Sequence, residues 1–220
     1  VNVFLFFILS LTEFKKKIKK NSFRNNIFLW FYPYKECQSL LSNTERKIAE
    51  SLPNERNKLF TFSRGCARNA LSSLFSVDCM EVPLIAIPGE PPKLEDDLGH
   101  ISFSHSPEAF VIAWSYEGIG IDIENSRRKI NNLKLFSKFF MAQEKEFFSL
   151  EENTISFLSN WVLLESAIKW NRGGIYQDIK DWQLNKSLTL ATNKKKKLQV
   201  YTKLINYKKF LIGIACNNLK

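Results

Sequence analysis

An alternating segment, GIGIDIE at residues 118–124, constrains the fold of this chain more than any other stretch. Alternation places the three isoleucines on one face of a β-strand and Asp122 and Glu124 together on the other. Two neighbouring carboxylates repel each other unless a positive group lies between them. They therefore belong either to a solvated polar face or to a site for a hard cation such as Mg²⁺.

Strand-like and helix-like segments follow one another in short runs along most of the 220 residues. This order predicts an α+β fold made of two similar halves that meet near residues 116–117. The expected division is an extension at 1–21, an N-terminal half at 22–116 and a C-terminal half at 117–220. The pattern predicts strands at 27–34, 110–114, 118–124, 182–192, 197–205 and 208–217, and helices at 36–52, 56–75, 132–150 and 154–171.

The first residues carry an apolar run at 1–11 and a basic run, KKKIKK, at 15–20. The apolar run is about half as long as a membrane-spanning helix needs. Its positive charge follows the apolar part, whereas a secretory signal carries the charge first. We expect a disordered extension or a misassigned start, with a membrane-surface anchor as the alternative.

The formal charge of +10 predicts an anionic partner: nucleic acid, a phosphorylated ligand, an acidic protein or a lipid surface. Four cysteines with no CxxC pair and only two histidines argue against a zinc site. Free thiols indicate a reducing compartment, so a cytoplasmic protein is expected.

Three further clusters have both a structural and a functional interpretation. Glu165 and Lys169 lie one helical turn apart, as an ordinary surface pair or as a third carboxylate beside a phosphate-binding lysine. His105, between two serines, is either a core histidine or a phosphate donor. A stripe of arginines on one helix face suits either a solvated surface or phosphate capture; it consists of Arg56, Arg64 and Arg68.

Taken together and in this order, the motifs resemble the Sfp-type 4′-phosphopantetheinyl transferases over residues 56–183. The family motif (I/V)G(I/V)D-x-E is matched at 119–124, and W-x-x-K-E-(A/S)-x-x-K is matched at 161–169. The family's SHS motif is matched at 104–106, and its FFxxxE motif at 139–144. Two arginines eight apart, as in the branch found with siderophore synthases, are matched by Arg56 and Arg64.

The resemblance implies that the active site lies between the two halves. Members transfer phosphopantetheine from coenzyme A to a serine of an apo acyl or peptidyl carrier protein, with Mg²⁺, and release 3′,5′-ADP. The implied partners are coenzyme A and an acidic carrier protein, with no nucleic acid and no membrane span, and a monomer is expected.

Family roles carry over to individual residues of this sequence. The implied Mg²⁺ ligands are Asp122, Glu124 and Glu165. The implied phosphate contacts are Ser104, His105 and Lys169. Arg64, together with Arg56 or Arg68, is implied to bind the outer phosphate of coenzyme A. Glu144 or Glu165 is implied to take the proton of the carrier serine.

Two positions depart from the family pattern. Leu164 stands where the family has the lysine of W-x-x-K-E, and Glu90 stands in its G-K-P loop, where Lys93 is the expected substitute. The alternatives are a basic module that binds nucleic acid or an anionic membrane, and a degenerate member that binds coenzyme A without catalysis. Asp122, Glu124 and Glu165 distinguish the transferase from the basic module. A module that binds anions gains nothing by gathering carboxylates at one point, where they would repel its ligand.

Overall fold

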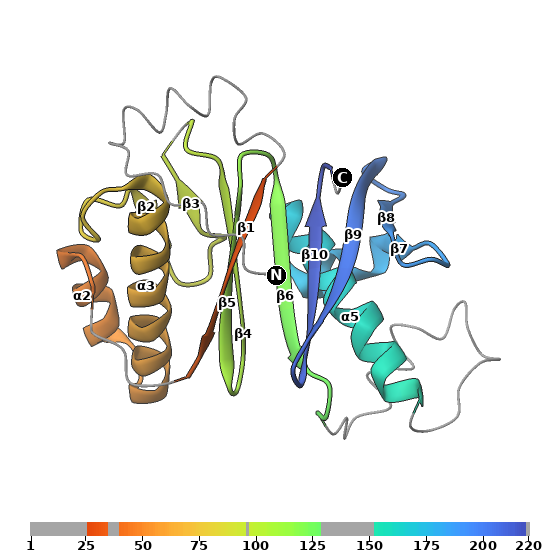
Figure 1. Ribbon diagram of the computed structural model, residues 1–220, viewed down its shortest axis with the longest axis horizontal. Coiled ribbons are helices and arrows are strands. Elements are labelled where there is room, and N and C mark those ends of the chain that lie inside the picture. The colour runs from red at the N-terminus through yellow and green to blue at the C-terminus, as the bar shows by residue number, and fades with distance from the viewer. Residues whose placement is uncertain (1–25, 35–39, 96, 129–151, 219–220) are drawn as a thin grey trace. The chain divides into compact units, whose positions relative to one another are not determined.

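The computed structural model describes residues 26–34, 40–95, 97–128 and 152–218, shown as coloured ribbon in Figure 1. The chain divides into two compact units, each made of two separate stretches of sequence. Unit 1 is Val1–Ile101 with Glu108–Tyr116, and unit 2 is Ser102–Pro107 with Glu117–Lys220. Both units mix helix and strand, so the predicted α+β class is confirmed.

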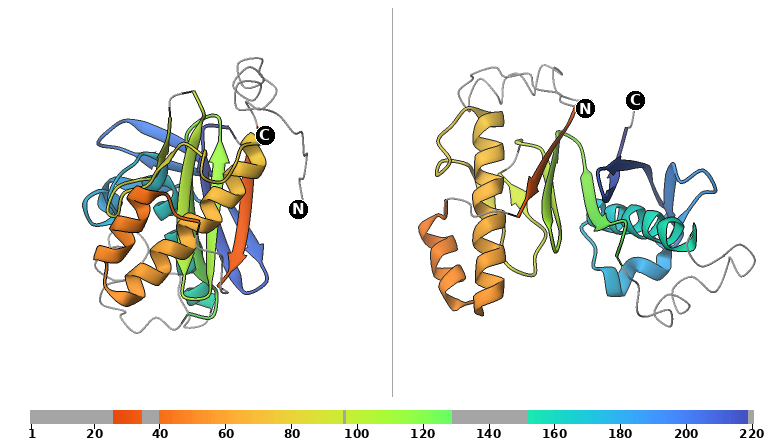
Figure 2. Two further views of the ribbon diagram at one scale, coloured as in Figure 1. Left: turned by 90° about the vertical axis from the view of Figure 1, so that its left-hand side faces the viewer. Right: turned by 60° about the horizontal axis from the view of Figure 1, so that its bottom comes forward.

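Unit 1 is built on α3, Asn54–Phe75, which confirms the long helix predicted from apolar spacing. The helix follows Pro53 and ends at Ser76, whose φ of 55° lies in the left-handed region. Helix α2, Asn43–Ser51, packs beside it (Figure 2). Ser42 and Glu45 form a capping box that fixes where α2 begins.

Two sheets complete unit 1. Strands β1, Ile27–Pro33, and β5, Ala109–Ser115, pair antiparallel with Ile27 opposite Ser115. Strand β4, His100–Ser106, continues this sheet in the order β1-β5-β4, and its residues 102–106 belong to unit 2. A small antiparallel pair, β2 at Leu84–Ile85 and β3 at Lys93–Leu94, follows α3 in the chain.

Unit 2 is an antiparallel sheet of five strands in the order β6-β10-β9-β8-β7. Helix α5, Glu152–Trp170, packs on one face of this sheet. Two glycines allow this packing, because a Cβ on Gly120 would collide with the backbone oxygen of Ser166, and one on Gly213 with that of Val162. The strands are β6 Ile119–Asn125, β7 Trp182–Leu184, β8 Leu190–Asn193, β9 Leu198–Tyr207 and β10 Phe210–Cys216, with α6 at Ile175–Asp178 and the 3₁₀ turn η1 at Ile179–Asp181.

The predicted strand at 182–192 is wrong in one respect, since it is a hairpin of β7 and β8. The side-chain oxygen of Asn185 accepts hydrogen bonds from the backbone N–H groups of Thr189 and Leu190, which closes the turn. The helix expected at 36–52 begins only at residue 43, and the one expected at 132–150 lies outside the described residues. No helix in the described ranges is long and apolar enough to cross a membrane.

Candidate functional site

The two carboxylates of β6 lie on the strand face that the alternation predicted. Ile119, Ile121 and Ile123 are buried on one face. Asp122 is opposite Gly213 in the sheet and is buried, with 3% of its surface exposed. Glu124 is half-buried at the end of the strand and forms an ion pair with Arg128.

Helix α5 brings Glu165 and Lys169 to Asp122, although 43 residues of sequence separate Asp122 from Glu165. The ammonium Nζ of Lys169 is 2.6 Å from Asp122 Oδ1 and 3.7 Å from Glu165 Oε2. Glu165 is buried, while the Lys169 side chain is 26% exposed. The pair at 165 and 169 is therefore part of a buried charge cluster and not an ordinary surface pair.

Strand β4 contributes the third side of the cluster through Ser104. Its hydroxyl Oγ donates to Asp122 Oδ1 at 2.6 Å and accepts from Lys169 Nζ at 3.0 Å. It also accepts from the backbone N–H of Ile123 at 3.3 Å. His105, next in sequence, is exposed, and the charges of Lys169 and Asp122 act on its imidazole.

Burial and neighbouring charge shift the proton affinities of this cluster. Desolvation, reinforced by the charge of Asp122, raises the pKa of Glu165 to about 8, and desolvation also raises the pKa of Glu124. Desolvation lowers the pKa of His105, and the charge of Lys169 adds to that effect. For Lys169, desolvation opposes the charged form, but attraction to Asp122 and Glu165 outweighs it and raises the pKa.

The chemistry of these donors fits a hard divalent cation, since such ions prefer carboxylate oxygens. Asp122 Oδ2 is buried and has no hydrogen-bond partner among the described residues, so a cation would satisfy it. In the part of the chain that the structure describes, no three His, Cys, Asp or Glu side chains are grouped so that they could hold a metal ion. The ammonium of Lys169 supplies the positive charge between Asp122 and Glu165 instead.

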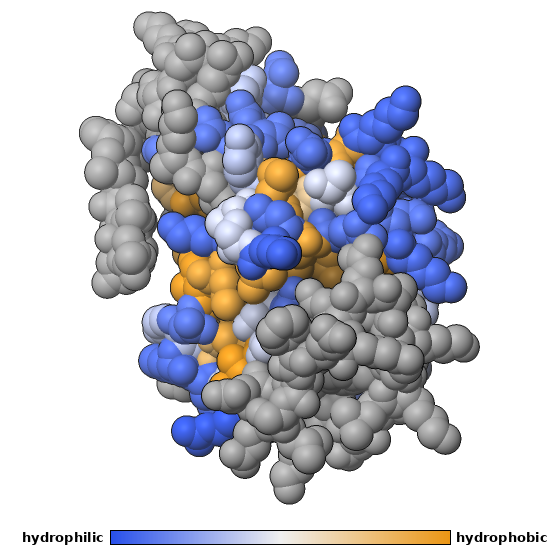
Figure 3. Space-filling view, turned by 90° about the vertical axis from the view of Figure 1, so that its right-hand side faces the viewer, coloured by the Kyte–Doolittle hydropathy of each residue, from blue (hydrophilic) through white to orange (hydrophobic). Residues whose placement is uncertain are grey.

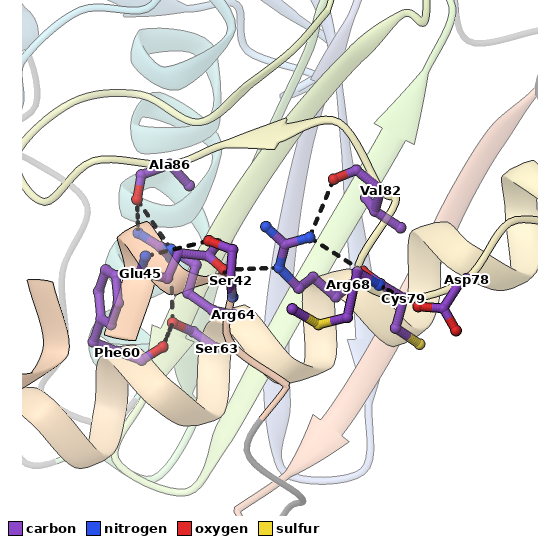
Figure 4. A network of polar contacts seen from close by, with 11 residues as sticks. Ser42, Glu45, Phe60, Ser63, Arg64, Arg68, Asp78, Cys79, Val82 and Ala86 are labelled. Atoms are coloured by element: carbon purple, nitrogen blue, oxygen red, sulfur yellow. Dashed lines mark hydrogen bonds and ion pairs between the residues drawn. The ribbon is translucent and has the colours of Figure 1, made fainter. Parts of the chain in front are cut away.

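Two members of the predicted arginine stripe, Arg64 and Arg68, have partners within unit 1 (Figure 4). Arg64 donates through Nε and NH2 to the carbonyl oxygen of Ala86, at 3.0 and 2.6 Å, and lies over the ring of Phe60. Arg68 donates to Glu45 Oε2 at 2.8 Å and to the carbonyls of Cys79 and Val82 at 3.1 Å. Both guanidiniums are buried.

The remaining predicted positions are scattered. Arg56 on α3 and Lys93 on β3 are exposed, and so is Glu90. Leu164 is buried in a hydrophobic cluster with Ile168 and Trp182, so the leucine packs in the core of unit 2. Glu144 lies outside the described residues, as does the rest of the 139–144 motif.

Two residues of these clusters were not predicted from the sequence. Glu45 neutralises Arg68, and the only local signal for it is the capping-box spacing from Ser42. Arg128 pairs with Glu124, and no periodicity predicts this contact because it spans the end of β6 and the turn that follows.

A comparison with known protein families finds a match over the segment that contains Asp122 and Glu165. The family model described as 4′-phosphopantetheinyl transferase superfamily matches residues 118–215, which run from β6 through α5 and β7 to β9 into β10. No curated protein matches the chain significantly. The chain therefore carries a domain of the 4′-phosphopantetheinyl transferase superfamily, the family that its motifs predicted.

Proposed function

We propose that this protein transfers 4′-phosphopantetheine from coenzyme A to a serine of an apo carrier protein, with Mg²⁺, and releases 3′,5′-ADP. The family supports a phosphopantetheinyl transferase in general terms. The observation that carries the proposal is the cluster of Asp122, Glu165 and Lys169, in which segments far apart in sequence join within 3.7 Å.

Asp122, Glu124 and Glu165 would hold the divalent cation, whose binding would have to draw these carboxylates together, since they are not grouped as a metal site among the described residues. When bound, the ion would act as a Lewis acid that polarises the pyrophosphate of coenzyme A. The unpartnered Oδ2 of Asp122 supports this assignment, because a buried acceptor without a partner carries a cost that a cation removes.

The cationic side chains of the cluster would act on the phosphates. Lys169 would contact a phosphate oxygen and stabilise the negative charge that builds up on the leaving group. His105, whose pKa is lowered by burial and by the charge of Lys169, would donate one N–H to phosphate. Glu165 or Glu144 would take the proton of the carrier serine, directly or through water. Arg56 and Lys93, which are exposed, remain the candidates for the outer phosphate of coenzyme A, whereas Arg64 and Arg68 are bonded inside the protein.

The basic C-terminal strands support an acidic protein as the second substrate. Residues 182–220 contain nine lysines and no Asp or Glu. The side of unit 2 that carries β7 to β9 is rich in hydrophilic residues (Figure 3). Such a surface would speed and orient the docking of an acidic carrier. Lysines exposed in this stretch are Lys186, Lys194, Lys195, Lys196, Lys197, Lys203 and Lys208.

The test is intact-mass spectrometry of an apo carrier protein after incubation with this protein, coenzyme A and Mg²⁺. We expect the mass gain of one phosphopantetheine, lost with EDTA and lost in Asp122→Ala. Gain of the group by Asp122→Ala at the wild-type rate would overturn the metal assignment. Failure of the wild type on several carriers, with coenzyme A bound, would favour the degenerate member. Failure without coenzyme A binding would favour the basic module.

A further inference from the structure

Ser104 has every hydrogen-bonding position of its hydroxyl engaged inside the protein. A hydroxyl offers one donor and two acceptor positions. The donor goes to Asp122 Oδ1 at 2.6 Å, and the acceptors receive Lys169 Nζ at 3.0 Å and the backbone N–H of Ile123 at 3.3 Å. The side chain is buried, with 5% of the residue exposed. A hydroxyl in this state has no proton left for a phosphate oxygen.

We propose that Ser104 is a positioning residue, which fixes Asp122 and Lys169 in the geometry of the transfer reaction and does not contact coenzyme A. The inference rests on the proposed function. It changes the role that the motif resemblance implied for Ser104, from a phosphate contact to a support for two other residues.

The geometry explains what such a support does. Asp122 Oδ1 accepts both the serine hydroxyl and the lysine ammonium at 2.6 Å, so this oxygen is committed within the protein. Its other oxygen, Oδ2, is the buried atom without a partner. Ser104 therefore holds the carboxylate so that one oxygen faces the lysine while the other stays available. Partners of this kind orient the reacting groups, and their loss commonly costs 10- to 100-fold in activity or metal affinity.

Ser102 provides a matched control two residues earlier on the same strand. Its hydroxyl accepts the backbone N–H of Ile121 at 3.1 Å, as Ser104 accepts that of Ile123. Ser102 is 4% exposed, so an alanine at either position removes an equally buried hydroxyl from the same strand of unit 2. The two positions differ in the contacts that Ser104 makes with Asp122 and Lys169.

The experiment compares Ser104→Ala, Ser104→Thr and Ser102→Ala by three measurements. These are kcat for carrier modification, the Kd of coenzyme A by calorimetry, and the ¹H–¹⁵N signal of the Lys169 ammonium in metal-free protein, assigned with Lys169→Met. We expect Ser104→Ala to lose about tenfold or more in kcat and to lose the ammonium signal, with the Kd unchanged within twofold. We expect Ser104→Thr to recover most of the kcat, and Ser102→Ala to keep the wild-type signal and rate.

Two results would overturn the proposal. Equal behaviour of Ser104→Ala and Ser102→Ala would mean that the hydroxyl only satisfies a backbone N–H. A weaker Kd of coenzyme A with kcat unchanged would make Ser104 a phosphate contact. If Ser104→Ala does not fold, the same measurements on Ser104→Cys test the proposal. This variant keeps a side chain of similar volume but replaces the hydroxyl with a weak hydrogen-bond donor.

The failure of the two proposals can be told apart. A wild-type protein that modifies no carrier would refute the transferase function alone. The ammonium signal is recorded without substrate or metal, so it would still show whether Ser104 fixes Lys169.

Discussion

Arg68 Nε donates to Glu45 Oε2 at 2.8 Å, and less than a tenth of either side chain is exposed. The pair joins α3 to the first turn of α2, where Glu45 also accepts the backbone N–H of Ser42 at 2.8 Å. The same guanidinium binds the carbonyls of Cys79 and Val82. One buried arginine thus ties together two helices and the irregular chain that follows α3.

We predict that Glu45→Gln lowers the free energy of unfolding by about 3 kcal/mol, because it leaves the buried guanidinium of Arg68 without a counter-charge. Urea unfolding of both proteins measures the change. Glu55→Gln is the control, since Glu55 pairs with Lys58 at 3.0 Å on the exposed face of α3 and should lose less than about 1 kcal/mol. Equal losses in the two variants would refute a special role for the buried pair.

The acidic half of the candidate site was predictable because it rests on local periodicity. Alternation in β6 fixed the face of Asp122, and a spacing of four placed Glu165 and Lys169 on one side of α5. Both patterns lie within single elements, where backbone geometry alone decides which side chains are neighbours.

The contacts of Ser104 and of the arginines were not predictable in this way. Ser104 reaches Asp122 because β4 lies beside β6. This placement of the two strands follows from tertiary packing, and sequence periodicity does not predict it. Arg64 and Arg68 share a helix face as predicted, yet their partners are mostly carbonyls of irregular backbone between residues 79 and 86. Nothing in a spacing pattern reports where such carbonyls point.

We predict that Gly120→Ala destabilises unit 2 strongly, by about 3 kcal/mol or more. The added Cβ would collide with the backbone oxygen of Ser166, and backbone cannot give way as a flexible side chain does. Gly174→Ala is the control, because its Cβ would be 3.3 Å from the side-chain oxygen of Gln177, which can move. Thermal unfolding measures both, and a folded Gly120→Ala of wild-type stability would show that α5 packs further from β6.

We predict that Lys169→Met makes the protein more dependent on divalent cations. The substitution removes the ammonium at Asp122 and leaves this buried carboxylate without its counter-charge, which destabilises the metal-free protein by about 2 kcal/mol. Mg²⁺ or Mn²⁺ should then raise the Tm of this variant more than that of the wild type, because the ion binds only the folded state. Lys58→Met, at an exposed pair, should show no such gain.

Glu165 predicts the pH dependence of stability in metal-free protein. Its pKa is raised to about 8 in the folded state against a usual value of 4.5, so between these values the folded chain holds a proton that the unfolded chain has lost. Stability therefore falls as pH rises from about 4.5 to about 8 and then levels off. The lowered pKa of His105 acts in the opposite direction below its usual 6.5, so the fall above pH 7 comes from groups whose pKa is raised, chiefly the carboxyl groups.

Urea unfolding in EDTA at pH 7 and at pH 8.5 measures this fall, and Glu165→Gln should remove most of it. The remainder belongs to Glu124 and, towards pH 8.5, to the thiol of Cys216, because burial raises the pKa of both groups. Because a divalent cation competes with the proton for these carboxylates, its stabilising effect should grow over the same pH interval. A Glu165→Gln variant that keeps the full wild-type slope would place the responsible carboxyl elsewhere and would remove Glu165 from the buried charge cluster.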